Sequence, residues 1–264
     1  MRTAHLKKLI LAVALGGLLV SSTTVAVAHQ ASGDETAASA TVVTCAGLQA
    51  TVVGTSGPDT LVAKDGDIVA ALGGDDTVVV ETSQATVCGG SGDDLIEVTS
   101  DASGAGASAR IALFGESGND LLGVVSPNES VNSSMQLDGG GGSDDLTGGR
   151  ANDQIDGGNG ADSVAAGSGN DTINGGSGND LIAAGSGVDR VKAKDGKDIV
   201  TGGNGTDVIR GGGDSDRLSG GGGNDQLKGQ GGNDNLKGNA GRDTAVGGKG
   251  RDRCRAEIKR GCER

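Results

Sequence analysis

Aspartate recurs at a fixed interval in the C-terminal half of the chain, and its carboxylate is the side chain best placed there to do chemistry. Residues 139–255 divide without gaps into thirteen nonapeptides, such as GGSGNDLIA and GGNGTDVIR, and the sixth position is always Asp. The preceding positions are mostly Gly, Ser and Asn, which form turns and tolerate positive φ. Carboxylates and turn carbonyls offer only oxygen, so the pattern indicates a site for a hard divalent cation. The aspartates are Asp144, Asp153, Asp162, Asp171, Asp180, Asp189, Asp198, Asp207, Asp216, Asp225, Asp234, Asp243 and Asp252.

A short strand must follow each of these turns and hold it in place. Positions seven to nine predict three residues of strand, in which position eight points inward and positions seven and nine point outward. Position eight is Leu, Ile or Val in eleven of the thirteen units, whereas Lys and Arg gather at positions seven and nine. Two nonapeptides then make one coil of 18 residues, with turns on alternate sides. The expected core is Leu146, Ile155, Val164, Ile173, Ile182, Val191, Val200, Ile209, Leu218, Leu227 and Leu236.

The pattern G-G-x-G-x-D-x-U-x resembles the RTX, or haemolysin-type, calcium-binding repeat. The resemblance implies an all-β fold, a right-handed parallel β-roll, with several calcium ions held between successive turns on the same side. It implies one row of ligands from Asp144 to Asp252 and a second from Asp153 to Asp243, alternating along the chain, with at most six and five sites. Three units, GGRANDQID, AKDGKDIVT and GGGDSDRLS, depart from the pattern. These departures weaken the prediction next to Asp153, Asp198 and Asp216.

A looser form of the same repeat extends back to residue 54. The segments GTSGPDTLV, ALGGDDTVV, GGSGDDLIE and GESGNDLLG place Asp59, Asp76, Asp94 and Asp120 at the sixth position. The steps between them, and on to Asp144, equal one coil or one coil plus an insertion. We therefore expect these four aspartates to continue one row of metal ligands, with variable loops along the opposite edge.

Composition narrows both the metal and the class of protein. The chain has 53 Gly, one Phe and no Trp or Tyr, so no core of large aromatic side chains can form. Calcium fits irregular turns better than magnesium, which prefers tight octahedral geometry, and the two His residues leave zinc few ligands. The net charge of −13 disfavours binding to nucleic acid.

The N-terminus and the cysteines indicate export. A basic start, an apolar run from Leu9 to Val20 and the small residues Ala26-Val27-Ala28 are typical of a secretory signal peptide cleaved after Ala28. An N-terminal membrane anchor is the alternative, but the apolar run is short of the ~20 residues that a span needs. Four cysteines in an exported chain favour disulfides. Three pairings are open; proximity favours Cys254–Cys262, which leaves Cys45–Cys88.

These predictions divide the chain into five parts. They are a signal peptide (1–28), an N-terminal segment with the first strands (29–53), a degenerate repeat region with inserted loops (54–138), thirteen repeats (139–255) and a C-terminal cap (256–264), in which Ile258 is expected to fold over the last coil. The predicted function is a secreted calcium-binding module, not an enzyme, that folds with calcium and serves a structural, surface or interaction role with an unknown extracellular partner. Alternatives are a haemolysin-like toxin or exoenzyme-associated protein, or an adhesin or matrix protein. Motifs such as H-E-x-x-H and G-x-S-x-G are absent.

Overall fold

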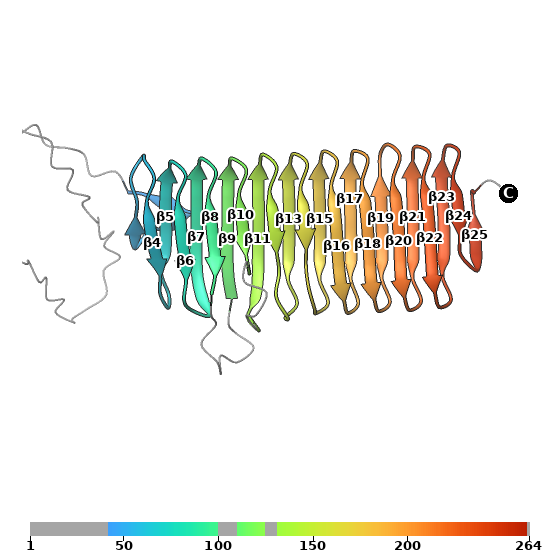
Figure 1. The fold of residues 1–264 in the computed structure, drawn as a ribbon, viewed down its shortest axis with the longest axis horizontal. Helices are drawn as coiled ribbons and strands as arrows, with labels where there is room; N and C mark the ends of the chain where they lie inside the picture. Colours follow the sequence, from blue (N-terminus) through green and yellow to red (C-terminus); the bar gives the residue numbers. More distant parts are fainter. Residues whose placement is uncertain (1–41, 100–109, 125–130, 263–264) are drawn as a thin grey trace, which may run out of the picture. The chain divides into compact units, whose positions relative to one another are not determined.

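The structure, a computed structural model, describes residues 42–99, 110–124 and 131–262. The predicted signal peptide and the centres of two predicted loops, 100–109 and 125–130, lie outside the described residues. The chain from Val43 onward forms one compact unit, a roll of parallel strands (Figure 1). Its described residues contain no helix, and therefore none long and apolar enough to cross a membrane.

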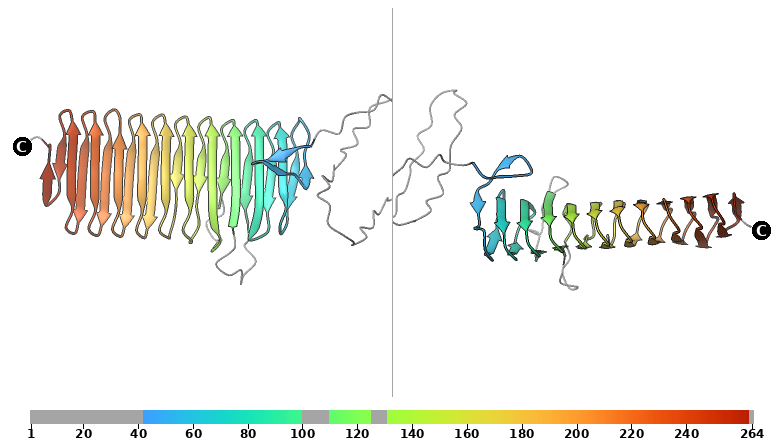
Figure 2. Two further views of the ribbon diagram at one scale, coloured as in Figure 1. Left: turned by 180° about the vertical axis from the view of Figure 1, so that it is seen from behind. Right: turned by 90° about the horizontal axis from the view of Figure 1, so that it is seen from above.

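The roll consists of two parallel sheets that face each other along its length (Figure 2). The even sheet has eleven strands: β4 (Thr60–Ala63), β6 (Thr77–Val80), β8 (Leu95–Val98), β10 (Leu121–Gly123), β12 (Asp145–Thr147), β14 (Ser163–Ala165), β16 (Leu181–Ser186), β18 (Ile199–Asn204), β20 (Arg217–Gly222), β22 (Asn235–Ala240) and β24 (Arg253–Arg255). The odd sheet has twelve: β3 (Val52–Val53), β5 (Ile68–Gly73), β7 (Gln84–Ser91), β9 (Arg110–Ser117), β11 (Ser134–Gly141), β13 (Gln154–Asn159), β15 (Thr172–Ser177), β17 (Arg190–Asp195), β19 (Val208–Gly212), β21 (Gln226–Gly231), β23 (Thr244–Lys249) and β25 (Ile258–Arg260).

The chain alternates between the sheets, so each strand pairs with the strand one coil away. In the repeat region the register is 18 residues, as in Ile155 opposite Ile173 and Val191 opposite Ile209. The parallel β-roll with its 18-residue coil is therefore confirmed. Most strands there are longer than the three residues predicted, because the ladder of backbone hydrogen bonds continues from position nine into the turn; β21 and β22 each have six residues.

The core lies between the sheets and is one aliphatic side chain deep in each half-coil of the repeat region. All eleven predicted core residues, Leu146 to Leu236, are at most 2% exposed. The basic side chains at positions seven and nine point away from it, and Arg190, Lys192 and Lys228 are exposed. The predicted division between core and outer surface is thus confirmed.

Disulfides secure both ends of the roll, with the expected pairing. The hairpin of β1 (Thr44–Cys45) and β2 (Leu48–Gln49) packs on the outer surface of the odd sheet, where Cys45 is bonded to Cys88 (Figure 2). At the other end, Cys254 is bonded to Cys262 and β25 adds a last strand beside β23.

The predicted role of Ile258 is wrong. Its side chain is 37% exposed, because the segment after Cys254 extends the odd sheet instead of folding across the coil. Ala256 and Cys262 pack against the core there.

Candidate metal-binding site

Two rows of aspartates run along the two edges of the roll. The long row lies at the turns from the odd to the even sheet, and the short row at the turns from the even to the odd sheet. The long row contains Asp59, Asp76, Asp94, Asp120, Asp144, Asp162, Asp180, Asp198, Asp216, Asp234 and Asp252. The short row contains Asp153, Asp171, Asp189, Asp207, Asp225 and Asp243.

In every row aspartate except Asp59, one carboxylate oxygen accepts a hydrogen bond from a backbone N–H of the preceding coil. In the repeat region the backbone N–H of Asp162 donates to Oδ1 of Asp180 over 3.0 Å, and the N–H of Asp171 donates to Oδ1 of Asp189 over 2.8 Å. The same bond crosses the larger steps, from Asp94 to Asp120 and from Asp120 to Asp144, at 2.8 Å. The four aspartates of the degenerate region therefore continue the long row, as the spacing predicted.

The other oxygen, Oδ2, has no hydrogen-bond partner in most of these residues. It is buried and unpaired in fifteen of the seventeen aspartates, all except Asp59 and Asp153. A buried acceptor without a partner is costly, and a buried charge more so. These oxygens are therefore suited to bind a cation.

Backbone carbonyls lie beside the unpaired oxygens. A Cβ placed on Gly175, at position one, would lie 2.5 Å from Oδ2 of Asp180 and 2.7 Å from the carbonyl oxygen of Ala193, one coil later. Gly202 has the same relation to Asp207 and Gly220, at 2.5 and 2.6 Å. Glycine at position one thus leaves room for a carboxylate oxygen and a carbonyl oxygen to face the same space.

Burial raises the pKa of many of the row carboxylates. The pKa of Asp120 and of Asp216 rises to about 7 because burial disfavours the charged form, although a backbone N–H bond lowers it and neighbouring carboxylates add to the rise. The pKa of Asp144 and of Asp180 rises to about 6 for the same reasons. A cation at the row would relieve the cost of ionising these groups.

At the first aspartate of each row, the protein itself donates hydrogen bonds to Oδ2. Oδ2 of Asp59 accepts hydrogen bonds from the Thr55 backbone N–H and hydroxyl, and Oδ2 of Asp153 accepts one from the Gly149 N–H at 2.9 Å. At the far end of the short row, the Asp243 N–H donates to the Glu257 carboxylate at 2.7 Å. Sequence reasoning missed Glu257, because it lies outside the nine-residue register.

A second ladder at position five was also missed. The N–H of Val188 donates to Oδ1 of Asn170 at 2.7 Å, and the N–H of Lys197 donates to Oδ1 of Asn179 at 2.8 Å. These bonds point to the preceding coil, whereas the aspartate bonds point to the following one. The signal was present in the sequence, since Asn recurs at position five, but it was interpreted only as turn chemistry.

No three His, Cys, Asp or Glu side chains converge on a single point among the residues that the structure describes. The available donors in each turn are instead one carboxylate oxygen and backbone carbonyls. This all-oxygen set fits calcium, which accepts carbonyl ligands and irregular geometry, and does not fit soft metals.

Comparison with known proteins agrees with this donor set. The family model of the RTX calcium-binding nonapeptide repeat matches residues 138–173, 156–191, 193–227 and 228–257. These are RTX calcium-binding repeats. The matches begin at residue 138, shortly before Asp153 starts the short row. The RTX part of the roll is therefore the part that carries carboxylates along both edges. No curated protein and no solved structure matches the chain.

Apart from the N-terminal hairpin, the described strands form one parallel β-roll, and the RTX repeats make up its C-terminal half. No separate catalytic domain is present among these residues. The repeats indicate a calcium-binding structural module. The function of the chain is therefore inferred from this module.

Proposed function

We propose that the protein is a secreted calcium-binding module whose roll folds when calcium occupies the aspartate rows. The observation that carries this proposal is the buried, unpaired Oδ2 in fifteen of the seventeen predicted ligands. Without a cation, folding would line up buried carboxylates one coil apart; with calcium, the same oxygens become ligands.

The proposed ligands follow from the contacts of the two rows. They are the fifteen carboxylates with an unpaired Oδ2, together with the carbonyl oxygens of position one in the next coil. Asp59 and Asp153 are proposed as end groups, because the Oδ2 atom of each already accepts protein hydrogen bonds. Calcium would supply charge neutralisation and a link between coils.

Two observations support export. Both pairs of cysteines form disulfides in the described residues, and disulfides persist in oxidising compartments. The N-terminal sequence has the layout of a signal peptide. Extracellular calcium would then be available to the protein on arrival, and the roll would serve as a structural or interaction module.

The test is far-UV circular dichroism of the chain from residue 29, first in chelator and then during titration with calcium or magnesium. We expect the strand signal to appear with calcium and to need far more magnesium. Equilibrium dialysis against radioactive calcium should show several ions bound per chain. A full strand spectrum in chelator that calcium leaves unchanged, or equal potency of magnesium, would contradict the proposal.

A further inference from the structure

The surface charge of the roll is divided between its two halves, which the net charge conceals. Among described residues that are not buried, residues 42–156 contain eleven acidic and three basic side chains, whereas residues 157–262 contain three acidic and fifteen basic ones. The C-terminal half appears balanced in sequence only because its row aspartates are buried. The roll therefore has one acidic and one basic half.

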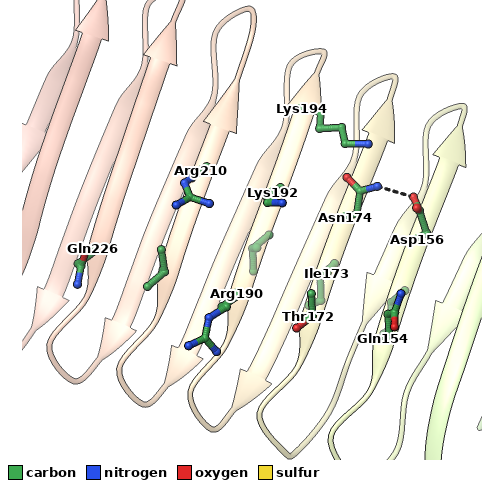
Figure 3. A pocket seen from close by; sticks show the side chains of 13 residues that line it. Gln154, Asp156, Thr172, Ile173, Asn174, Arg190, Lys192, Lys194, Arg210 and Gln226 are labelled. Atoms are coloured by element: carbon green, nitrogen blue, oxygen red, sulfur yellow. Dashed lines mark hydrogen bonds between the residues drawn. The ribbon is translucent and has the colours of Figure 1, made fainter.

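One row of outward side chains on the odd sheet reproduces this division strand by strand. The side chains at position nine stack along the sheet from β9 to β23, in the register of the strand pairs. In order they are Phe114, Asp138, Asp156, Asn174, Lys192, Arg210, Lys228 and Val246. Figure 3 shows the central part of this row, where Asn174 donates to Asp156 at 2.7 Å and the basic side chains follow.

The order of charges along this row of position-nine side chains is complementary to the same row in the opposite direction. If a second copy faced it in the opposite direction, about a two-fold axis parallel to the strands between β15 and β17, each residue would meet a suitable partner. Asn174 would face Lys192 of the other copy, Asp156 would face Arg210, and Asp138 would face Lys228. The outermost pair would be Phe114 and Val246. By symmetry every pair occurs twice.

The neighbouring rows allow this arrangement. At position seven, Thr172 would face Arg190 and Gln154 would face Val208, so no like charges meet. At position two, Lys194 would face Gly176, which leaves room for the long side chain. The surface is hollowed between β13 and β21 by a depression of about 650 Å³, which can accept side chains or water from a facing copy.

A parallel arrangement of two copies would have the opposite consequence. An axis along the roll would place Asp156 against Asp156 and Arg210 against Arg210, and like charges that face each other suppress association. The charge pattern thus selects the antiparallel dimer over the parallel one.

We propose that the outer surface of the odd sheet from β9 to β23 is a docking surface for a second copy of this chain, which binds antiparallel. Eight strands at ~4.8 Å and six residues at ~3.3 Å give a footprint of roughly 760 Å² per copy. This matches the ~800 Å² per partner of a standard interface. The hairpin β1–β2 packs mainly on β5 and β7, at the border of this area.

The test is sedimentation equilibrium of the chain from residue 29 in calcium, with paired charge reversals. Asp156→Arg and Arg210→Asp, each alone, place like charges opposite each other twice per dimer, so the dissociation constant should rise at least about tenfold. The double variant restores opposite charges and should return most of that loss. Arg217→Asp, on the outer surface of the even sheet, is the matched control and should leave the dimer unchanged.

Cross-linking gives a second measurement that does not depend on strong association. Facing sheets lie ~10 Å apart, so Asn174→Cys near the axis should be joined to its counterpart by a short bis-maleimide, whereas Thr201→Cys on the even sheet should not. A chain that stays monomeric and is not cross-linked at Asn174→Cys overturns the proposal. So does a dimer that Arg210→Asp leaves intact, or a double variant without recovery. A monomer that instead binds dextran sulfate through Arg210 would also overturn it, and would assign the basic surface to a polyanion.

Discussion

The turns from the even to the odd sheet differ between the two halves of the roll. In the RTX repeats they carry the short row of aspartates, whereas in the N-terminal half the same column of the sheet holds Ala85, Ile111 and Met135. All three are buried, and the Met135 N–H still donates to the Asp153 carboxylate where the two kinds of column meet. A position that is carboxylate in one half is therefore aliphatic in the other.

The facing column changes in the opposite sense. Position one before the short-row aspartates is always small: it is Gly148, Ala166, Ala184, Gly202, Gly220 and Gly238. In the N-terminal half the equivalent buried residues are Val80 and Val98. A small residue with aspartate and valine with an aliphatic residue are thus two ways to fill the same edge. The first requires a cation, and the second relies on burial of apolar surface.

The largest expected effect follows from removal of calcium. Chelation should abolish amide protection in the strands β13–β23, because both edges of these coils are carboxylate, while β6–β9 should keep substantial protection. The N-terminal strands have the aliphatic edge and the Cys45–Cys88 bond. Hydrogen exchange measured by mass spectrometry, with and without chelator, makes this comparison within one molecule. Equal loss in both regions would show that the aliphatic edge confers no independence from calcium.

The second prediction concerns pH in the absence of metal. In the folded state burial raises the pKa of many row carboxylates above the unfolded value of about 3.8, and the pKa of Asp120 and of Asp216 reaches about 7. The folded state therefore binds more protons, so the metal-free roll should gain stability as pH falls from about 8 to about 5 and lose it as pH rises through these values. The strand signal of the metal-free chain, followed by circular dichroism as the pH is lowered, measures the change.

Calcium should reverse this dependence and so provides the control. Protons compete with the ion for the same oxygens. In calcium the midpoint of urea unfolding should therefore fall as the solution is acidified over the same range. The RTX half, which has two rows, should respond more than the N-terminal half, which has one. A metal-free strand signal that rises with pH would contradict the assignment of raised pKa values to the rows.

The third prediction exchanges the chemistry of the two columns. Met135→Asp extends the short row by one residue into the aliphatic column and should destabilise the roll in calcium by about 2–5 kcal/mol, the range for loss of a buried Met side chain. Met135→Leu keeps the volume and should cost less than about 1.5 kcal/mol. Urea unfolding measures both. If Met135→Asp is as stable as the parent, the two columns are interchangeable and the distinction between the halves fails.

The sequence predicted most of the fold because the nine-residue register fixes it. An invariant Asp and an aliphatic residue two positions later determine which side chains enter the core and which carboxylates align. The long row was predicted even through insertions, since Asp94, Asp120 and Asp144 keep the same turn. These features depend on local periodicity, which one sequence displays in full.

Features that depend on pairing between coils could not be read in the same way. Glu257 takes the place of a row aspartate from outside the register, and Ile258 joins a sheet edge that only the assembled roll provides. The basic surface of the C-terminal half does not show in the sequence, because the count of Asp includes carboxylates that the roll buries. In each case the missing information was pairing between coils or burial, which the type of residue alone does not give.

The smallest effect separates a row member from an end group. Asp180→Asn keeps an oxygen for the Asp162 N–H and replaces the unpaired Oδ2 with an amide that can donate to the carbonyl oxygen of Ala193. This variant should be more stable than the parent in chelator, by about 1–3 kcal/mol, because a buried unpaired acceptor is removed. In calcium it should be less stable and bind about one ion fewer, because a charged ligand is lost.

Asp153→Asn should behave in the opposite way in chelator. Both oxygens of Asp153 accept backbone N–H groups, from Met135 at 2.8 Å and Gly149 at 2.9 Å, so the amide must lose one of these bonds. We expect a loss of about 1 kcal/mol in chelator and no change in the number of calcium ions bound. Titration with trimethylamine N-oxide in chelator, which favours the folded state and is followed by circular dichroism, gives the sign for each variant, and equilibrium dialysis counts the ions. Opposite signs in chelator arise only if Oδ2 is unpaired in one residue and bonded in the other. Equal signs would remove the distinction between the end of the short row and the aspartates that we propose as ligands.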